Sequence, residues 1–309
     1  MKSLLYTHTD LDGVGSAVLA TLLATLESEW DIQFLDNSQV SAAIQELFTS
    51  STFEKYDRIV VADLPVTMAT AETLYHLSIF REVRLLDHHK TTLPVADRYP
   101  EWATVVVEDE SIPQCGTLLF YKEFCQDIRS DLIDNFVEAV RAWDTWTWQT
   151  DGNELSEKLQ LLHLNSRSNI DFTKMMSSNL REGSILTEKN RVIIAHAKME
   201  ECKYLENMKN KWFEFEYEGN KFAAVLAGRY SSKLGNIISK EHPEYVGVVM
   251  LTEYGLSFRT SRTDFDVSAV AKSLGGGGHQ QAAGASFNAT GMKLLMEAAF
   301  ESMKKQSQI

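Results

Sequence analysis

Short apolar runs alternate with amphipathic stretches through the first third of the chain. Apolar runs bounded by polar residues are typical of strands buried in a sheet, and apolar positions spaced three and four apart indicate helices packed on it. This alternation predicts a doubly wound parallel sheet, in which ligands bind outside the carboxyl ends of the strands. The expected strands are Leu4–Thr7, Ile32–Leu35, Arg58–Ala62, Val83–Leu86 and Thr104–Val107, and expected helices include Gly15–Leu26 and Val66–Leu77.

Farther along, the pattern is helical from Asp131 to about Trp148 and again through the polar stretch Ile185–Lys211, which contains no Gly or Pro. The pattern then favours a smaller α/β region. Its expected strands are Trp212–Tyr217, Phe222–Ala227, Val246–Leu251 and Leu256–Thr260, and its expected helices are Asp266–Leu274 and Gly291–Lys304. We therefore expect an α/β domain at residues 1–183, a helical linker at 184–211 and a second, smaller α/β domain at 212–309.

Composition narrows the class of protein. The 309 residues are 44% hydrophobic and 24% charged, as in a globular protein with a real core. No apolar run approaches the roughly 20 residues that cross a bilayer, and acidic residues follow the N-terminus too closely for a signal peptide. The three cysteines form no CxxC pair, which favours a reducing compartment. We expect a cytoplasmic protein that does not contact membranes.

The net charge limits the partners. The chain has 30 Lys and Arg against 43 Asp and Glu, for a net charge of −13. Because long duplexes are bound largely by neutralising their phosphates with Lys and Arg, duplex DNA is not an expected partner. Small anionic substrates remain compatible with this charge if metal ions and a few local cations offset the repulsion.

Acidic and histidine residues follow three of the expected strands. His8, Asp10 and Asp12 alternate in the segment HTDLDG, and on an extended segment their side chains would point the same way. Clustered carboxylates either raise their pKa values or bind cations. Carboxylate and imidazole without thiolate suit Mn²⁺ or Mg²⁺ better than a structural Zn²⁺. The competing interpretation is a helix-capping Asp followed by a solvated turn.

Other members of this group are ambiguous when taken singly. Asp63 follows the strand RIVVA, where Asp is commonly a helix N-cap. Asp87, His88 and His89 end the next strand, and Asp144 lies in a tryptophan-rich helical segment where an exposed carboxylate is the simplest interpretation. Their shared placement at strand ends carries more information than any one of them.

Together these residues resemble the DHH phosphoesterase superfamily in order, spacing and context. HxDxDG, a strand-terminal Asp, a strand-terminal DHH and a later Asp match its N-terminal half. The segment FRTSRTDFDVSAVAKSLGGGGHQQAAGASF, residues 258–287, resembles the DHH-associated C-terminal domain with its GGGH signature. The spacing His8-x-Asp10 is closer to the oligoribonuclease-like and RecJ-like branches than to the pyrophosphatases.

The resemblance implies two adjacent divalent ions, Mn²⁺ foremost and Mg²⁺ as the alternative, that activate a water molecule. It places Asp63 and His89 in direct catalytic roles, with Asp63 bridging the ions and His89 contacting the substrate phosphate. The implied metal ligands are His8, Asp10, Asp12, Asp63, His88 and Asp144.

The glycine run before His279 would let backbone amides approach an anion closely, although taken alone it is better interpreted as a flexible helix terminator. By resemblance, the second domain grips the end of the substrate away from the cleaved bond. The expected substrate-binding residues are Arg259, Arg262, Gly276, Gly277, Gly278 and His279. Arg229 and Lys233 fit a phosphate contact and a solvated surface equally well. His163 is interpreted as an ordinary structural histidine, and Trp143, Trp146 and Trp148 are interpreted as core residues rather than a base-stacking platform.

The predicted function is metal-dependent hydrolysis of short single-stranded oligoribonucleotides to nucleoside monophosphates. The main alternative is a phosphodiesterase for cyclic mono- or dinucleotides, and a non-catalytic nucleotide sensor on the same fold ranks below it. A pyrophosphatase is disfavoured by the spacing after His8. The oligomeric state, a homodimer included, stays open.

Overall fold

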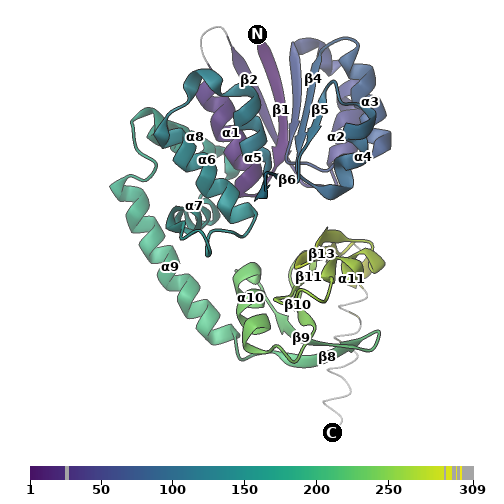
Figure 1. The fold of residues 1–309 in the computed structure, drawn as a ribbon, viewed down its shortest axis with the longest axis vertical. Coiled ribbons are helices and arrows are strands. Elements are labelled where there is room, and N and C mark those ends of the chain that lie inside the picture. Colours follow the sequence, from purple (N-terminus) through teal and green to yellow (C-terminus); the bar gives the residue numbers. More distant parts are fainter. Residues whose placement is uncertain (25–27, 289, 294–296, 298–299, 301–309) are drawn as a thin grey trace. The chain divides into compact units, whose positions relative to one another are not determined.

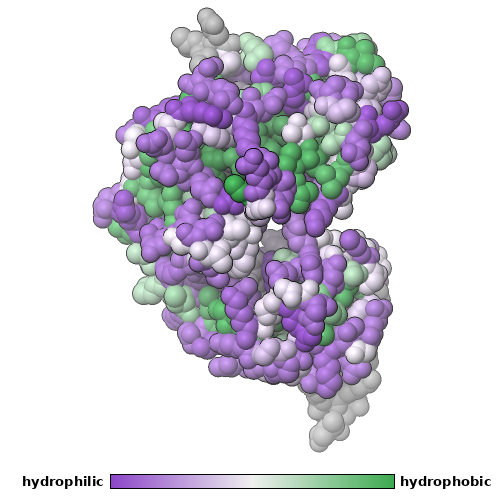
Figure 2. Space-filling model, viewed as in Figure 1, coloured by the Kyte–Doolittle hydropathy of each residue, from purple (hydrophilic) through white to green (hydrophobic). Residues whose placement is uncertain are grey.

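The computed structural model describes residues 1–24, 28–288, 290–293, 297 and 300. The chain divides into two compact units, unit 1 at Met1–Ala197 and unit 2 at Lys198–Ile309. Among the described residues, no helix combines the length and apolarity needed to span a bilayer. Polar residues cover most of the visible surface in Figure 2, as the acidic composition leads one to expect.

Unit 1 is built on a five-stranded sheet in the order β2-β1-β3-β4-β5, with all neighbouring strands parallel. The predicted doubly wound parallel sheet is therefore confirmed. This strand order reverses direction between β1 and β3, and such a switch point is where ligands bind in open α/β sheets. The strands are β1 (Lys2–His8), β2 (Glu29–Leu35), β3 (Arg58–Ala62), β4 (Glu82–Asp87) and β5 (Ala103–Val105).

Helices cover both faces of this sheet (Figure 1). On one face lie α2 (Val40–Thr49), α3 (Met68–Ser78) and α4 (Leu93–Arg98). On the other lie α1 (Leu11–Leu23), α5 (Gly116–Phe124), α6 (Asp131–Asp144) and α8 (Asn169–Arg181), with α7 (Glu154–Leu164) nearby. Short 3₁₀ turns at Thr52–Lys55, Lys90–Thr92 and Gln126–Ile128 and a small hairpin of β6 (Glu108–Asp109) and β7 (Ile112–Pro113) complete the unit.

The core of unit 1 follows from the pattern of its strands. Leu4, Ile59 and Leu85 are fully buried and pack with Ile44 of α2 and Leu74 of α3. At roughly 25 cal/mol per Å² of apolar surface, each such side chain stabilises the fold by about 1.5–3 kcal/mol. This packing fixes the sheet, and the sheet in turn fixes the loops at its carboxyl edge.

Unit 2 contains a six-stranded mixed sheet in the order β12-β13-β11-β10-β9-β8. Only β9 and β10 pair in parallel among these neighbours. Helix α9 (Glu188–Met208), the predicted connecting helix, runs from unit 1 into unit 2, and the boundary between the units falls within it. The remaining elements are β8 (Phe213–Tyr217), β9 (Asn220–Leu226), α10 (Ser231–Glu241), β10 (Gly247–Leu251), β11 (Gly255–Arg259), α11 (Val267–Ser273), β12 (Gly277–His279) and β13 (Ala282–Ser286).

Each face of this second sheet carries its own core. Leu234 and Ile238 of α10 pack against Val225 and Met250 on one face, and the other face packs against α11. The predicted last helix, Gly291–Lys304, lies largely outside the described residues, and residues 290–293 are helical.

Candidate metal centre

Three neighbouring strands deliver the predicted ligands to one edge of the sheet in unit 1. β1, β3 and β4 lie side by side and parallel, so the residues after them converge. Within the part of the chain that the structure describes, ligand atoms within 4.8 Å of one another form three groups, and Asp63 belongs to two of them. The groups are His8, Asp10 and Asp63; Asp12, His88 and Asp144; and Asp63, Asp87, His88 and His89.

The turn after β1 differs from the extended segment expected for HTDLDG. The Asp10 carboxylate accepts a hydrogen bond from the amide of Gly13 at 3.0 Å and caps α1, which therefore starts at Leu11. Asp12 consequently lies in the first turn of the helix. His8 and Asp10 still meet, with 2.9 Å between Nδ1 and Oδ2, but Asp12 points to a different part of the site.

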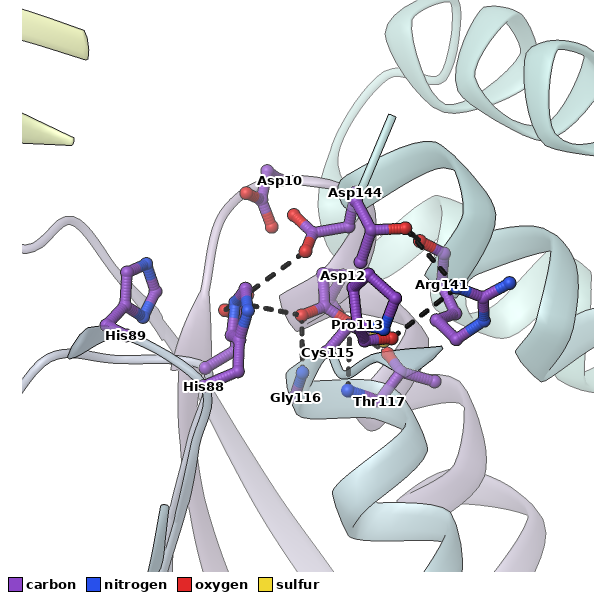
Figure 3. Close-up of polar contacts among 12 residues, drawn as sticks. Asp10, Asp12, His88, His89, Pro113, Cys115, Gly116, Thr117, Arg141 and Asp144 are labelled. Atoms are coloured by element: carbon purple, nitrogen blue, oxygen red, sulfur yellow. Dashed lines mark hydrogen bonds and ion pairs between the residues drawn. The ribbon is translucent and has the colours of Figure 1, made fainter. Parts of the chain in front are cut away.

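The N-terminus of α5 holds Asp12 in place (Figure 3). The buried Asp12 carboxylate accepts hydrogen bonds from the amides of Gly116 at 2.6 Å and Thr117 at 2.8 Å. The Thr117 hydroxyl donates a hydrogen bond to the backbone carbonyl of Asp12. The partial positive charge of a helix N-terminus stabilises a carboxylate placed there. Gly116 is needed for a second reason, because a Cβ at this position would overlap the Cβ of Asp63.

Asp63 sits at the centre of the cluster. It is 2% exposed, and its backbone adopts a left-handed φ of 56°. The interpretation of Asp63 as a helix N-cap is wrong, because Thr67 caps α3 and accepts the amide of Thr70. Strained backbone of this kind is concentrated at functional sites.

The electrostatics of Asp63 fit a cation-binding role. Burial, together with repulsion from Asp12, Asp10 and Asp144, raises the pKa of Asp63 well above its usual value. Its Oδ2 atom is buried and has no hydrogen-bond partner among the described residues. A buried oxygen with excess negative charge around it is the environment that a divalent cation would relieve. The donor set therefore fits metal ions.

His88 connects the groups. Its ring is buried, and its Nε2 atom lies 3.2 Å from Asp63 Oδ1, 3.7 Å from Asp144 Oδ2 and 3.8 Å from Asp12 Oδ2. Figure 3 shows Asp12 and Asp144 directed toward this ring. Asp144, which alone would be interpreted as exposed, ends α6 with a side chain only 22% exposed. Burial raises the pKa of Asp144, the nearby His88 lowers it, and repulsion from Asp12 raises it further, so that the pKa of Asp144 is about 7.

His89 is oriented by Asp87, a residue whose role the sequence did not reveal. Burial lowers the pKa of His89, but the 2.7 Å contact with Asp87 outweighs it and raises the pKa to about 9. His89 is therefore a cation at neutral pH. Asp87 also accepts the backbone amide of His88 at 2.9 Å. One buried carboxylate thus fixes both histidines of the DHH segment.

The segment around Asp144 corrects another expectation. Trp143, Trp146 and Trp148 are all partly exposed, so their interpretation as core residues is wrong. Their rings contact one another, with centroids 5.5 to 6.0 Å apart. Arg141, one turn before Asp144, is buried and paired with Glu138.

The expected substrate-binding residues lie in unit 2. The Arg259 guanidinium donates to the hydroxyl of Ser232 at 2.8 Å and to the carbonyl of Phe258, and burial lowers its pKa to about 10. No carboxylate pairs with it among the described residues. Arg262 is partly exposed and bound to Asp264 at 2.6 Å, so its charge is already partly neutralised.

The glycine run is more ordered than a flexible loop. Gly275, at φ 80°, terminates α11, and Gly277–His279 form β12 paired with β13. A Cβ on Gly276 or Gly278 would overlap β13, whereas one on Gly277 would meet nothing within 4 Å. Two of the three glycines are therefore explained by sheet packing. His279 ends β12 and is exposed.

Two other cations of unit 2 differ in their surroundings. Lys233 is paired with the buried carboxylate of Glu201 at 2.6 Å, which favours a structural role for it. Arg229 is exposed, and its guanidinium lies over the ring of Tyr230.

Comparison with known proteins agrees with the sequence motifs. Residues 219–305 match the DHHA1 domain family. Over 307 residues the chain is 28% identical to oligoribonuclease NrnB of Bacillus subtilis (strain 168), covering 96% of this chain and 75% of that protein.

Solved structures with a similar fold include two whose TM-scores exceed 0.5. The pGpG-specific phosphodiesterase PggH from Vibrio cholerae has a TM-score of 0.52 at 15% identity, covering 99% of each chain. RecJ in complex with Mn²⁺ from Thermus thermophilus has a TM-score of 0.51 at 17% identity, covering 98% of this chain and 51% of RecJ. At these identities the likeness concerns the fold.

Proposed function

We propose that this chain is a phosphoesterase of the DHH superfamily, to whose DHHA1 domain family residues 219–305 are similar, and that it hydrolyses short oligoribonucleotides to nucleoside monophosphates. The observation that carries the proposal is the position of Asp63 between His8 and His88. Its Oδ2 lies 4.0 Å from His8 Nδ1 and its Oδ1 lies 3.2 Å from His88 Nε2, and the buried Oδ2 has no hydrogen-bond partner among the described residues. The name of the Bacillus subtilis relative, an oligoribonuclease, supports the choice of substrate.

Six residues would hold two ions. His8 and Asp10 would bind the first ion, and Asp12, His88 and Asp144 would bind the second. Asp63 would bind both. Oxygen and nitrogen donors without thiolate favour Mn²⁺, with Mg²⁺ as the alternative. When bound, the ions supply a water of lowered pKa and offset the charge that develops on the phosphate oxygens.

One further residue would contact the substrate, and others hold the site in place. Protonated His89, 29% exposed, is placed to donate a hydrogen bond to a phosphate oxygen, and Asp87 keeps it charged and oriented. The amides of Gly116 and Thr117 hold the Asp12 carboxylate so that it cannot rotate away from His88. Pre-organised groups of this kind stabilise a transition state without reorganising during the reaction.

The two halves of the chain would divide the work. Residues 1–183 would carry the chemistry, 184–211 would connect, and 212–309 would bind the end of the substrate through Arg259, Arg262, Gly276–Gly278 and His279. A charge-assisted phosphate contact is typically worth about 1.5–3 kcal/mol. His279→Ala should therefore raise the KM for a dinucleotide roughly ten- to a hundredfold while Mn²⁺ binding stays unchanged. Loss of Mn²⁺ binding in this variant would contradict the division.

The proposed setting is the cytoplasm, with the protein acting as a monomer or a homodimer on short single strands and not on duplex DNA. A cyclic mono- or dinucleotide phosphodiesterase is the alternative within the same chemistry. One panel separates these functions, namely labelled RNA of two to about twenty nucleotides, linear pGpG and cyclic nucleotides, each with Mn²⁺. Cleavage of short linear RNA supports the proposal, and activity on cyclic nucleotides alone supports the alternative. Binding of nucleotides without any turnover would identify a sensor.

A further inference from the structure

The connection between α7 and α8 reaches the turn that carries His8 and Asp10. Asn169, the first residue of α8, donates its Nδ2 to the backbone carbonyl of Thr9 at 3.0 Å. Thr9 lies between His8 and Asp10 and is 160 residues away from Asn169 in the sequence. This hydrogen bond therefore restrains the peptide that joins two of the proposed metal ligands.

His163 fixes the orientation of the Asn169 amide. Its Nε2 atom lies 3.0 Å from Asn169 Oδ1. A backbone carbonyl can only accept, so Asn169 must present its NH₂ group to Thr9 and its oxygen to His163, which in turn must donate from Nε2. Burial lowers the pKa of His163, which favours the neutral ring with a single proton. Its buried Nδ1 has no hydrogen-bond partner among the described residues, so in this tautomer no ring N–H is left unsatisfied there.

The pair is anchored in the core of unit 1. Ser168 caps α8 by accepting the amide of Asp171 at 3.1 Å, which sets the position of Asn169. The ring of fully buried Phe172 contacts His163 edge-on, with centroids 5.2 Å apart. The Thr9 side chain adds a weaker restraint, since its hydroxyl reaches Asp36 only at 3.3 Å.

We infer that Asn169 is a positioning residue for the metal half-site formed by His8, Asp10 and Asp63, and that His163 holds its amide in the required orientation. The inference rests on the proposed metal centre. With the Thr9 carbonyl released, His8 and Asp10 would sample geometries in which they no longer face Asp63 together. Loss of an outer partner typically costs 10–100-fold in metal affinity or activity.

Calorimetric titration of the metal-stripped protein with Mn²⁺ tests this inference. Asn169→Ala should weaken one of the two binding steps about tenfold and leave the other unchanged. Asn169→Asp keeps the size of the side chain and suits a helix N-terminus, yet cannot donate to Thr9, so it should weaken the same step even if the alanine variant folds poorly. Turnover of an RNA dinucleotide by either variant should recover toward the wild-type rate as Mn²⁺ is raised.

Asn165→Ala is the matched control, since Asn165 lies on the same connection but its side-chain amide donates to the carbonyl of Leu161 at 2.7 Å and not to the Thr9 turn. This variant should bind both ions as the wild type does. Wild-type Mn²⁺ affinity in Asn169→Asp would overturn the inference, as would equal losses of thermal stability in Asn169→Ala and Asn165→Ala with unchanged Mn²⁺ binding. A wild-type protein that binds no Mn²⁺ would instead refute the proposed metal centre.

Discussion

Replacing Asp63 with Asn tests the bridging role with little change in shape. Asn has nearly the same size as Asp and tolerates the left-handed backbone that this position adopts at φ 56°. The amide keeps an oxygen toward His88, whose Nε2 atom lies 3.2 Å from Asp63 Oδ1. What disappears is one negative charge in a residue that is 2% exposed. The substitution therefore separates ion binding from folding.

The magnitude follows from the position of Asp63 between His8 and His88, which belong to different proposed half-sites. Removing an outer partner of a metal ligand costs roughly 10–100-fold, so neutralising a ligand shared by two ions should cost at least about 100-fold in affinity for one of them. At 1.4 kcal/mol per tenfold, this is about 2.8 kcal/mol. The metal-free variant should nevertheless be at least as stable as the wild type, because the lost charge was repelled by Asp10, Asp12 and Asp144.

Three measurements make the assay. Calorimetry with Mn²⁺ should show one binding step lost or strongly weakened, thermal unfolding without metal should show no loss of stability, and dinucleotide turnover should fall below detection. Asp57→Asn provides the control, because it removes one negative charge at an exposed residue away from the site. The Asp57 carboxylate accepts a hydrogen bond from the backbone amide of Lys2. Turnover within a few-fold of the wild type would refute the bridging role of Asp63.

Other predictions concern the neighbours of Asp63 and the substrate. Gly116→Ala should weaken Mn²⁺ binding in calorimetry, because the added Cβ overlaps Asp63; unchanged affinity would mean that α5 can shift freely. The pKa of His89 is raised from its ordinary value of about 6.5 to about 9. The ring therefore stays protonated at neutral pH and loses its proton as the pH rises through 9. We expect kcat/KM of the wild type to fall as the pH rises through 9. His89→Gln should be slower and should not show this fall. The same fall near pH 9 in both proteins would exclude protonated His89 as the phosphate contact. RNA of about two to five nucleotides should be cleaved much faster than a twenty-mer, with weak salt dependence because few counterions are released. Equal rates and a steep salt slope would indicate a processive enzyme.

The sheet and the metal cluster could be predicted because both depend on local pattern. In the strand Arg58–Ala62, four consecutive apolar residues are buried, and β3 has the predicted bounds. Parallel strands bring their carboxyl ends together, so residues that follow them converge whatever the loops do. The start of α1 was misplaced because the capping bond from Gly13 to Asp10 competes with an extended backbone over only a few residues.

The supports of the cluster could not be predicted because they join distant segments. Gly116 and Asp12 are 104 residues apart in sequence, so no local pattern pairs the amide with the carboxylate. The role of His163 depends on Asn169 and Thr9, which only the packing of α8 brings together. The partial exposure of the tryptophans after Asp144 likewise depends on where α6 ends. A short helix start such as Cys115-Gly116-Thr117 after a polar turn is the one signal that could have been noticed.

The central claim is tested most directly by the rate at which a labelled RNA dinucleotide is cleaved as Mn²⁺ is titrated into the metal-stripped protein, with bound Mn²⁺ counted in the same samples. We predict no cleavage without metal and a rate that rises only as the second ion binds, reaching its maximum at two ions per chain. Full activity at one ion per chain, or no cleavage with two ions bound, would contradict the account.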